Sequence, residues 1–245
     1  MRVVSYNIHH GVGTDGRLDL ERTARTLATT GADLVGLQEV DRQFGARSAF
    51  VDQAAWLGER LGMHVAFGAA LDLAPPAAGR PRRQYGNAVL AVPEILGWRN
   101  VLLPRPAGTE QRALLEALVH VDGEPVRFLV THLQNSSQPA RLAQADAIRA
   151  VVDDVPAPVV LAGDLNARAG SREVRRLTAV LEDAWAEAGR GRGGTYPATT
   201  PRTRIDYVLS SPDLRAASAA VVDSRASDHR PVRADLESAG RGDGG

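Results

Sequence analysis

The sequence predicts a layered α/β fold with mixed β-sheets, and two observations support that prediction. Strand-like and helix-like segments alternate along most of the 245 residues, and a hairpin of two apolar strands interrupts the alternation near the middle of the chain. Alternating strands and helices are typical of layered α/β proteins, whereas a hairpin adds antiparallel pairing to the sheet. No glycine-rich dinucleotide fingerprint follows the first strand, so a purely parallel Rossmann arrangement is not favoured.

The N-terminal half begins with a strand-helix-strand unit. From hydrophobic periodicity we expect strands at 2–8, 32–40 and 86–92, helices at 18–29 and 53–62, and a surface loop rich in Pro and Gly at 73–84. Both helices are expected to stop at a glycine, Gly31 and Gly62, since glycine commonly follows the last helical residue.

The C-terminal half contains the hairpin and a further series of strands and helices. We expect hairpin strands at 113–121 and 125–133, helices at 139–152 and 171–185, and strands at 157–163, 204–210 and 231–237. Asp122 and Gly123 form a favoured tight-turn pair for the hairpin, because Gly123 can take a positive φ. The glycine-rich end of the chain, 238–245, predicts a disordered tail.

The composition narrows the class of protein. Hydrophobic residues make up 44% and charged residues 24%, which is ordinary for a globular domain. The 29 basic residues, all arginine, balance 29 acidic ones, which argues against a protein that mainly coats a polyanion but allows a local basic patch. The absence of cysteine excludes disulfides, thiolate catalysis and zinc-thiolate sites. With no apolar stretch near the roughly 20 residues that cross a bilayer and no leader-like segment, we expect a cytoplasmic protein.

Polar side chains stand at the ends of six expected strands. They are Asn7, Gln38 with Glu39, Thr131 with His132, Asp164 with Asn166, Asp206, and Asp228 with His229. Taken alone, the Asp-x-Asn pattern at 164–166 is more often a simple turn. If the six ends meet at one edge of the fold, they bring together four carboxylates, two imidazoles and three carboxamides on a rigid scaffold.

Such a collection suits metal-assisted hydrolysis of a phosphoester. Hard oxygen ligands without cysteine favour Mg²⁺ or Mn²⁺. Histidines beside the ion can donate to phosphate oxygens, and a carboxylate can orient and deprotonate the attacking water.

Seven motifs also occur in a fixed order, from residue 5 to residue 232. They read "SYNIHHG", "LVGLQEVD", "YGNAVLA", "THL", "LAGDLNA", "RIDYVL" and "SDHRPV". In this order they resemble the endonuclease/exonuclease/phosphatase family, with its pancreatic-type DNase and sphingomyelinase members. The resemblance implies a four-layered α/β sandwich, in which two mixed β-sheets pack face to face and are flanked by helices. Because the motifs come from both halves of the chain, we expect one catalytic domain over residues 1–237, acting as a monomer.

The resemblance also assigns roles to individual residues. The metal ligands would be Glu39, Asn7 and Asp228. The catalytic residues would be Asp164, as general base, and Asn166, as donor to the phosphate or leaving oxygen. His229 would lie beside the scissile phosphate, and Asp206 would orient it. His132 would be a second phosphate-binding histidine. Substrate binding falls to Arg112, Asn87 and His10. The sequence does not identify the residue that orients His132.

Each role has a structural alternative. Glu39 would instead need an arginine partner, and Asn7 would be a simple turn cap. Asp206 would form a buried ion pair with the nearby Arg204. Arg112 would be a solvated surface residue, and His10 an exposed loop residue.

The sequence therefore favours a metal-dependent phosphodiesterase that attacks the phosphorus with an activated water. A nuclease is slightly favoured over an enzyme acting on a phospholipid or a small phosphorylated molecule, because five loop arginines can attract a polyanion; these are Arg80, Arg82, Arg83, Arg190 and Arg192. Only 4% of residues are aromatic, which gives little support to a base-stacking platform. A non-catalytic phosphate-binding module is the third alternative.

Overall fold

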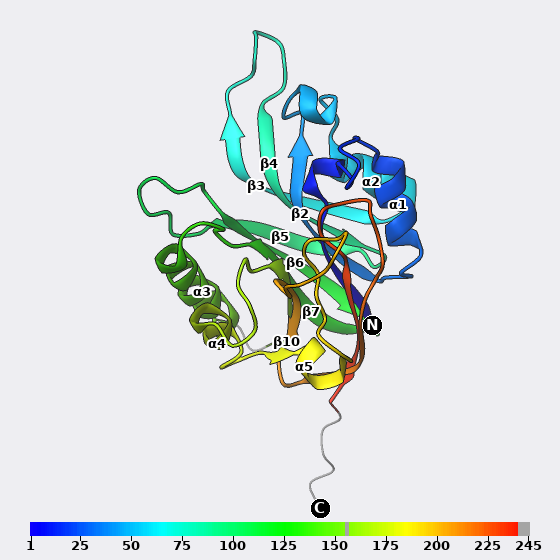
Figure 1. Ribbon diagram of the computed structural model, residues 1–245, viewed down its shortest axis with the longest axis vertical. Coiled ribbons are helices and arrows are strands. Elements are labelled where there is room, and N and C mark those ends of the chain that lie inside the picture. Colours follow the sequence, from blue (N-terminus) through cyan, green and yellow to red (C-terminus); the bar gives the residue numbers. More distant parts are fainter. Residues whose placement is uncertain (155–156, 240–245) are drawn as a thin grey trace, which may run out of the picture.

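The computed structural model describes residues 1–154 and 157–239 as two six-stranded sheets packed face to face (Figure 1). In spatial order, the first sheet consists of β11 (Leu214–Val221), β12 (Val232–Ser238), β1 (Arg2–Asn7), β2 (Leu34–Arg42), β4 (Arg83–Ala91) and β3 (His64–Leu73). The second consists of β5 (Ile95–Leu102), β6 (Ala113–Val121), β7 (Glu124–His132), β8 (Val159–Asp164), β10 (Asp206–Ser210) and β9 (Glu182–Asp183). Each sheet contains one parallel pair, β1 with β2 and β7 with β8, among antiparallel ones. The expected pair of mixed sheets is confirmed.

Among the described residues, four helices cover the outer faces of the sheets: α1 (Leu20–Ala28), α2 (Gln53–Leu61), α3 (Gln138–Asp153) and α4 (Arg172–Leu177). Helix α5 (Ala184–Ala188) instead packs against β10 and β11, one strand from each sheet. The short 3-10 turns are η1 (His9–Gly11) and η2 (Ala46–Ser48). Leu27 of α1 and Leu57 of α2 share one buried cluster with strands β1, β2 and β4. Ile148 of α3 and Leu177 of α4 share a second with strands of the other sheet. The chain therefore forms the four layers that the motifs implied.

The central core lies between the two sheets. It is rich in alanine and valine side chains from both inner faces, including Val89 of β4, Val130 of β7 and Val160 of β8, and Phe128 of β7 is its one aromatic member among the described residues. Gly36 of β2 sits where a Cβ would lie only 2.8 Å from side-chain carbons of Val130 and Ala162. Glycine at this position allows the two sheets to approach closely, which brings the ends of their strands to one edge.

Several predicted elements differ from the structure. Strands β3, β5 and β11 were not predicted, because their exposed edge positions interrupt the apolar pattern on which a sequence prediction depends. The single helix expected at 171–185 is wrong. It is replaced by α4, a turn, β9 and α5, since the Asp183 side chain accepts a hydrogen bond from the Trp185 amide and starts a new helix there.

The two ends of the loop expected at 73–84 belong to β3 and β4, and the rest connects them. Strand β12 extends to Ser238, the first residue of the expected tail. Residues 240–245 of that tail lie outside the described residues. Within the described ranges, no helix is long and apolar enough to cross a bilayer.

Candidate active site

The ends of strands from both sheets place the predicted residues at one edge of the fold. Asn7 ends β1, His132 ends β7 and Asp164 ends β8, where His132 and Asp164 are register partners. Asp206 begins the antiparallel strand β10 directly opposite Asp164. Because β1 and β8 face each other across the central core, side chains from both sheets meet here.

Asp164 lies at the centre of this group and is 1% exposed. Its Oδ2 atom accepts a hydrogen bond from the Asn7 carboxamide at 3.0 Å and lies 3.5 Å from His132 Nε2 and 3.7 Å from His229 Nε2. Burial and the neighbouring Asp206 carboxylate raise the pKa of Asp164, although His229 partly offsets both. A carboxylate with a raised pKa is suited to accept a proton near neutral pH.

His229 is held by a carboxylate on its far nitrogen. Asp206 Oδ2 lies 2.9 Å from His229 Nδ1, and both side chains are buried. Burial alone would lower the pKa of His229, but the carboxylates of Asp206 and Asp164 outweigh it and raise the pKa. His229 is therefore an imidazolium at neutral pH, and its Nε2 atom faces Asp164 as a charged donor.

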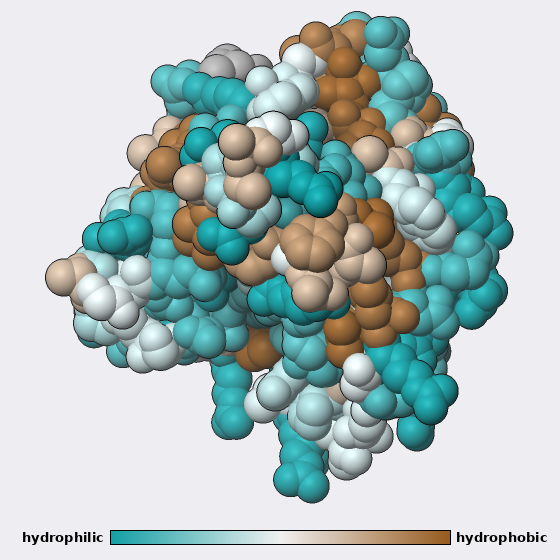
Figure 2. Space-filling model, turned by 90° about the horizontal axis from the view of Figure 1, so that it is seen from above, coloured by the Kyte–Doolittle hydropathy of each residue, from teal (hydrophilic) through white to brown (hydrophobic). Residues whose placement is uncertain are grey.

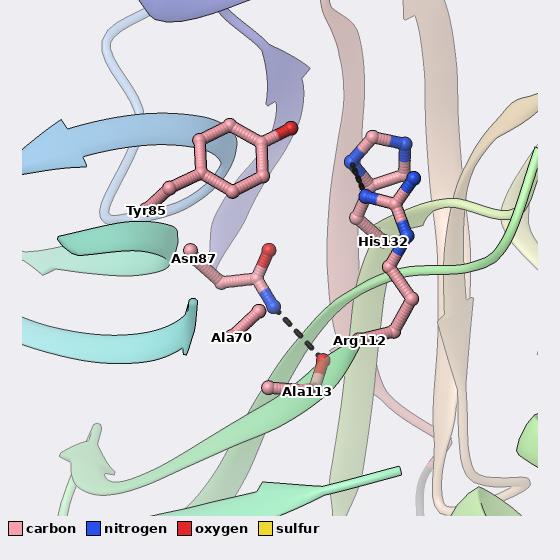
Figure 3. Close-up of a pocket in the computed structure, with 7 residues that line it drawn as sticks. Ala70, Tyr85, Asn87, Arg112, Ala113 and His132 are labelled. Carbon is pink, nitrogen blue, oxygen red and sulfur yellow. Dashed lines mark hydrogen bonds between the residues drawn. The ribbon is translucent and has the colours of Figure 1, made fainter. Parts of the chain in front are cut away.

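His132 is held by an arginine instead. The Arg112 guanidinium donates from Nη1 to His132 Nδ1 at 3.1 Å, as the dashed line in Figure 3 shows. Burial lowers the pKa of His132 far below its ordinary value, and the charges of Arg112 and His229 add to the effect. Because a guanidinium can only donate, Nδ1 is the accepting nitrogen and the proton of the neutral ring is on Nε2, facing Asp164.

A small cavity adjoins His132 and Arg112 (Figure 3). Its volume is about 10 Å³, and Tyr85 and Asn87 contribute to its lining. Asn87 donates from its carboxamide to the carbonyls of Ala113, at 2.9 Å, and Val130, at 3.3 Å, and so ties β4 to strands β6 and β7 of the other sheet. This space admits about one water molecule.

Glu39 reaches the site through an irregularity in β2. The register between β2 and β4 shifts between Leu37 and Val40, and Glu39 has a φ of 59°. Such a bulge redirects a side chain, and a left-handed backbone costs energy in a residue other than glycine. The Glu39 carboxylate accepts a hydrogen bond from the Asn7 carboxamide at 3.1 Å. No arginine within the described ranges forms an ion pair with it, so the alternative of a structural ion pair is wrong.

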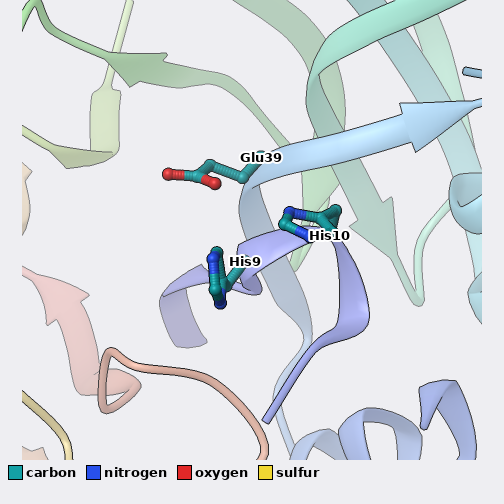
Figure 4. A group of neighbouring side chains, drawn as sticks. All are labelled: His9, His10 and Glu39. Carbon is teal, nitrogen blue, oxygen red and sulfur yellow. The ribbon is translucent and has the colours of Figure 1, made fainter. Parts of the chain in front are cut away.

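His9 and His10 lie beside Glu39 on η1 (Figure 4). The His9 ring lies 3.8 Å from Asp228 Oδ1, measured from Nδ1. Burial, followed by the charge of Arg47, lowers the pKa of His10 to about 4, which leaves the ring neutral. The alternative of a fully exposed loop residue is wrong for His10, since its ring is partly covered and faces the site.

Asn166 completes the group in a left-handed turn with a φ of 48°. Its amide N–H donates to Asp164 Oδ1 at 2.9 Å, and its carboxamide nitrogen donates to the Leu133 carbonyl at 3.0 Å. Two further alternatives are wrong. Arg204 pairs with Asp183 and not with Asp206, and Arg112 is 5% exposed and therefore no solvated surface residue.

Two other neighbours of the site were not predicted. The Tyr196 ring lies 4.8 Å from the His229 ring, centroid to centroid. Ser227 donates to the Asn7 carbonyl at 2.7 Å and accepts from the His229 amide at 3.2 Å. Ser227 precedes the Asp-His pair, so an Asx-type or Ser-type turn was a possible signal, whereas Tyr196 belongs to no recognisable pattern.

The fold and this site define a two-sheet α/β sandwich with carboxylate, imidazole and carboxamide groups gathered at one edge. Comparison with known proteins gives the same result. The family model described as "Endonuclease/Exonuclease/phosphatase family" matches residues 4–229. The chain belongs to this family, whose members are hydrolases acting on phosphoesters.

Solved structures of similar fold agree with the family assignment. An endonuclease/exonuclease/phosphatase from Beutenbergia cavernae aligns with a TM-score of 0.82 and 29% identity, over 98% of this chain and 72% of that one. The mannosyl-6-phosphatase Bt3783 of Bacteroides thetaiotaomicron aligns with a TM-score of 0.77 and 17% identity, over 97% and 99%. The human nocturnin catalytic domain aligns with a TM-score of 0.70 and 18% identity, over 97% and 94%. The last two likenesses concern the fold alone.

Proposed function

We propose that the protein is a divalent-metal-dependent phosphodiesterase that uses Asp164 to activate a water molecule. The main support for the proposal is the arrangement of side chains around Asp164. Two histidines and Asn7 converge on a single buried oxygen of Asp164, while the same Asn7 carboxamide contacts Glu39. A proton acceptor, three donors and a partly exposed carboxylate thus lie within one site.

The donor set fits Mg²⁺ or Mn²⁺. Glu39 has no arginine partner in the described part of the chain, and Asp228 is 39% exposed beside His9, so both carboxylates are available to a cation. We assign the ion to Glu39, Asn7 and Asp228, all oxygen ligands of the kind that Mg²⁺ prefers. A bound divalent ion would polarise a phosphate oxygen and neutralise part of the negative charge of the transition state.

The protein's own side chains activate the water and donate hydrogen bonds to the phosphate. Asp164 accepts a proton from the attacking water as its oxygen forms a bond to phosphorus. His229 donates a charged hydrogen bond and His132 a neutral one to phosphate oxygens, and Asn166 donates to the phosphate or leaving oxygen. The bond from phosphorus to the leaving oxygen breaks on the opposite side from the water, and that oxygen takes up a proton.

Nucleic acid remains our first choice of substrate, with a small phosphorylated molecule or lipid headgroup as the second. The nuclease proposal depends on arginines near the site that can bind successive phosphates. The second choice gains support because Arg82 already pairs with Asp72 and Arg83 donates to the Ala74 carbonyl, so two loop arginines have internal partners. Hydrophilic and hydrophobic residues also lie side by side on the face seen in Figure 2.

Two assays test this function. The full chain should hydrolyse bis(p-nitrophenyl) phosphate with Mg²⁺ or Mn²⁺ and lose the activity when a chelator is added; a metal-independent rate, or none at all, would contradict the proposal. Binding to oligonucleotides of increasing length in Ca²⁺ then separates the substrates. A nuclease should bind longer chains more tightly and lose affinity with salt, by a log-log slope of about −0.9 for each phosphate contacted in duplex DNA.

The single domain over 1–237, the monomeric state and the cytoplasmic location stay predictions.

A further inference from the structure

We propose that His9 and His10 join Glu39 in a mixed nitrogen and oxygen site that binds Mn²⁺ or Co²⁺ more tightly than Mg²⁺. The inference rests on the proposed function, because Glu39 is also the metal ligand assigned there. It adds two imidazoles to that assignment and with them a preference among divalent ions.

The three side chains are already close enough to share an ion. One potential ligand atom from each of His9, His10 and Glu39 lies within 4.8 Å of the other two (Figure 4). Two atoms bound to one first-row ion at about 2.1 Å each are at most about 4.2 Å apart. Movements of under about 1 Å therefore bring the three side chains into contact with a common ion.

The backbone holds both rings toward Glu39. His9 and His10 are consecutive left-handed residues, with φ values of 45° and 42°. The His9 amide donates to the Asn7 side-chain oxygen at 3.0 Å, and the Gln53 side chain donates to the His10 carbonyl at 2.7 Å. Asn7 and Gln53 are both fully buried, so an otherwise unfavourable turn is fixed from the protein interior.

Each ring has a nitrogen available to a ligand. His9 Nδ1 lies 3.3 Å from the Val12 carbonyl, which can only accept, so Nδ1 carries the proton and Nε2 has a free lone pair. A metal-binding histidine typically donates its other nitrogen in this way. His10 Nδ1 is buried and has no hydrogen-bond partner among the described residues, which is costly for a polar atom.

This donor set discriminates among ions. Mg²⁺ takes oxygen ligands almost exclusively, whereas imidazole nitrogen binds more tightly along the series from Mn²⁺ to Co²⁺ and beyond. Two histidines and one carboxylate that leave other positions open are a common arrangement for the later ions. The site thus combines the carboxylate that Mg²⁺ can use with two ligands that Mg²⁺ uses poorly.

The test titrates the metal-free full chain with MgCl₂, MnCl₂ and CoCl₂, followed by calorimetry and, for Co²⁺, by visible absorption. The double variant His9→Asn, His10→Asn keeps a residue type that tolerates a left-handed backbone. We expect its Co²⁺ affinity to fall by about tenfold or more and its Mg²⁺ affinity to change by less than about threefold. His64→Asn and His120→Asn, both at exposed positions, are the matched controls and should leave both affinities unchanged.

The outcomes separate this inference from the proposed function. An unchanged Co²⁺ affinity in the folded double variant, or in His10→Asn alone if the double variant does not fold, would overturn the inference. If Glu39→Gln still weakens all three ions in that case, the proposed function stands without it. If Glu39→Gln leaves Mg²⁺ affinity and Mg²⁺-dependent hydrolysis unchanged, the proposed function fails as well.

Discussion

His229 and His132 approach the same oxygen of Asp164, at 3.7 and 3.5 Å, yet their far nitrogens have opposite partners. His229 Nδ1 faces the Asp206 carboxylate and His132 Nδ1 faces the Arg112 guanidinium. The two rings are equally buried, at 5% and 6% exposure, so burial cannot explain the difference between them. The partner decides the charge: the carboxylate makes His229 an imidazolium, and the arginine keeps His132 neutral.

This difference predicts unequal contributions to catalysis, and removal of His229 should have the larger effect. His229→Ala should lower kcat by roughly 10²-fold or more, as expected for a charged group that stabilises a transition state. His132→Ala should lower kcat by about tenfold, because hydrogen bonds from neutral donors are about half as strong. Steady-state rates on bis(p-nitrophenyl) phosphate measure both, with His120→Ala as a control. Equal losses in folded variants would contradict the assigned charge states.

Removing the carboxylate partner should convert His229 into a ring more like His132. The charge of Asp206 raises the pKa of His229 against the effect of burial, so Asp206→Asn should lower that pKa. The imidazolium is then lost at a lower pH, and the alkaline limb of the pH–rate profile should move to lower pH. We expect kcat at neutral pH to fall by about tenfold or more. A profile that keeps the wild-type alkaline limb would show that Asp206 does not set the charge of His229.

A smaller effect is expected when the arginine partner is removed. Arg112→Met eliminates the donor to His132 Nδ1 and a nearby positive charge, so the pKa of His132 should rise while burial continues to oppose the charged form. With its ring less well fixed, kcat/KM should fall by about three- to tenfold. Arg80→Met, in the exposed loop, is the control. Unchanged activity together with an unchanged His132 titration would show that Arg112 neither fixes the His132 ring nor keeps it neutral.

The smallest predicted effect concerns Tyr196, which contacts His229 alone of the two histidines. An aromatic ring beside a cation contributes about 0.5–1 kcal/mol at an exposed position such as this one, so Tyr196→Leu should lower kcat by about two- to fivefold. Tyr196→Phe retains the ring and should retain the rate. If Phe and Leu have the same effect, the ring contact does not stabilise the charged form of His229.

The sequence predicted which residues meet at this edge better than it predicted their partners. Asn7, His132, Asp164 and Asp206 could be located because each follows or begins a buried strand, and parallel neighbours end at the same edge. The Arg112 contact with His132 was not predicted, since the sequence did not identify the residue that orients His132.

The fold shows the same division between apolar patterns and local geometry. Strands with continuous apolar runs, such as β8, were predicted, whereas edge strand β5 was not, because Leu96, Trp98 and Leu102 are exposed on it. The bulge that redirects Glu39 also leaves no mark in the sequence, because it depends on the register between β2 and β4. Sequence patterns indicate which residues are buried, whereas edge strands and bulges depend on how the strands pair with one another.

The most direct test of the opposite charge states is a titration of the two imidazoles by nitrogen-15 NMR, with His229→Ala and His132→Ala used to assign the signals. We predict that His229 keeps both ring protons from acidic pH through neutral pH and loses one only well above pH 7, because its pKa is raised. We predict that His132 shows a neutral ring protonated on Nε2 at neutral pH and stays neutral well below its ordinary pKa. Two histidines that titrate together near pH 6.5, the ordinary value for this side chain, would contradict the opposite charge states.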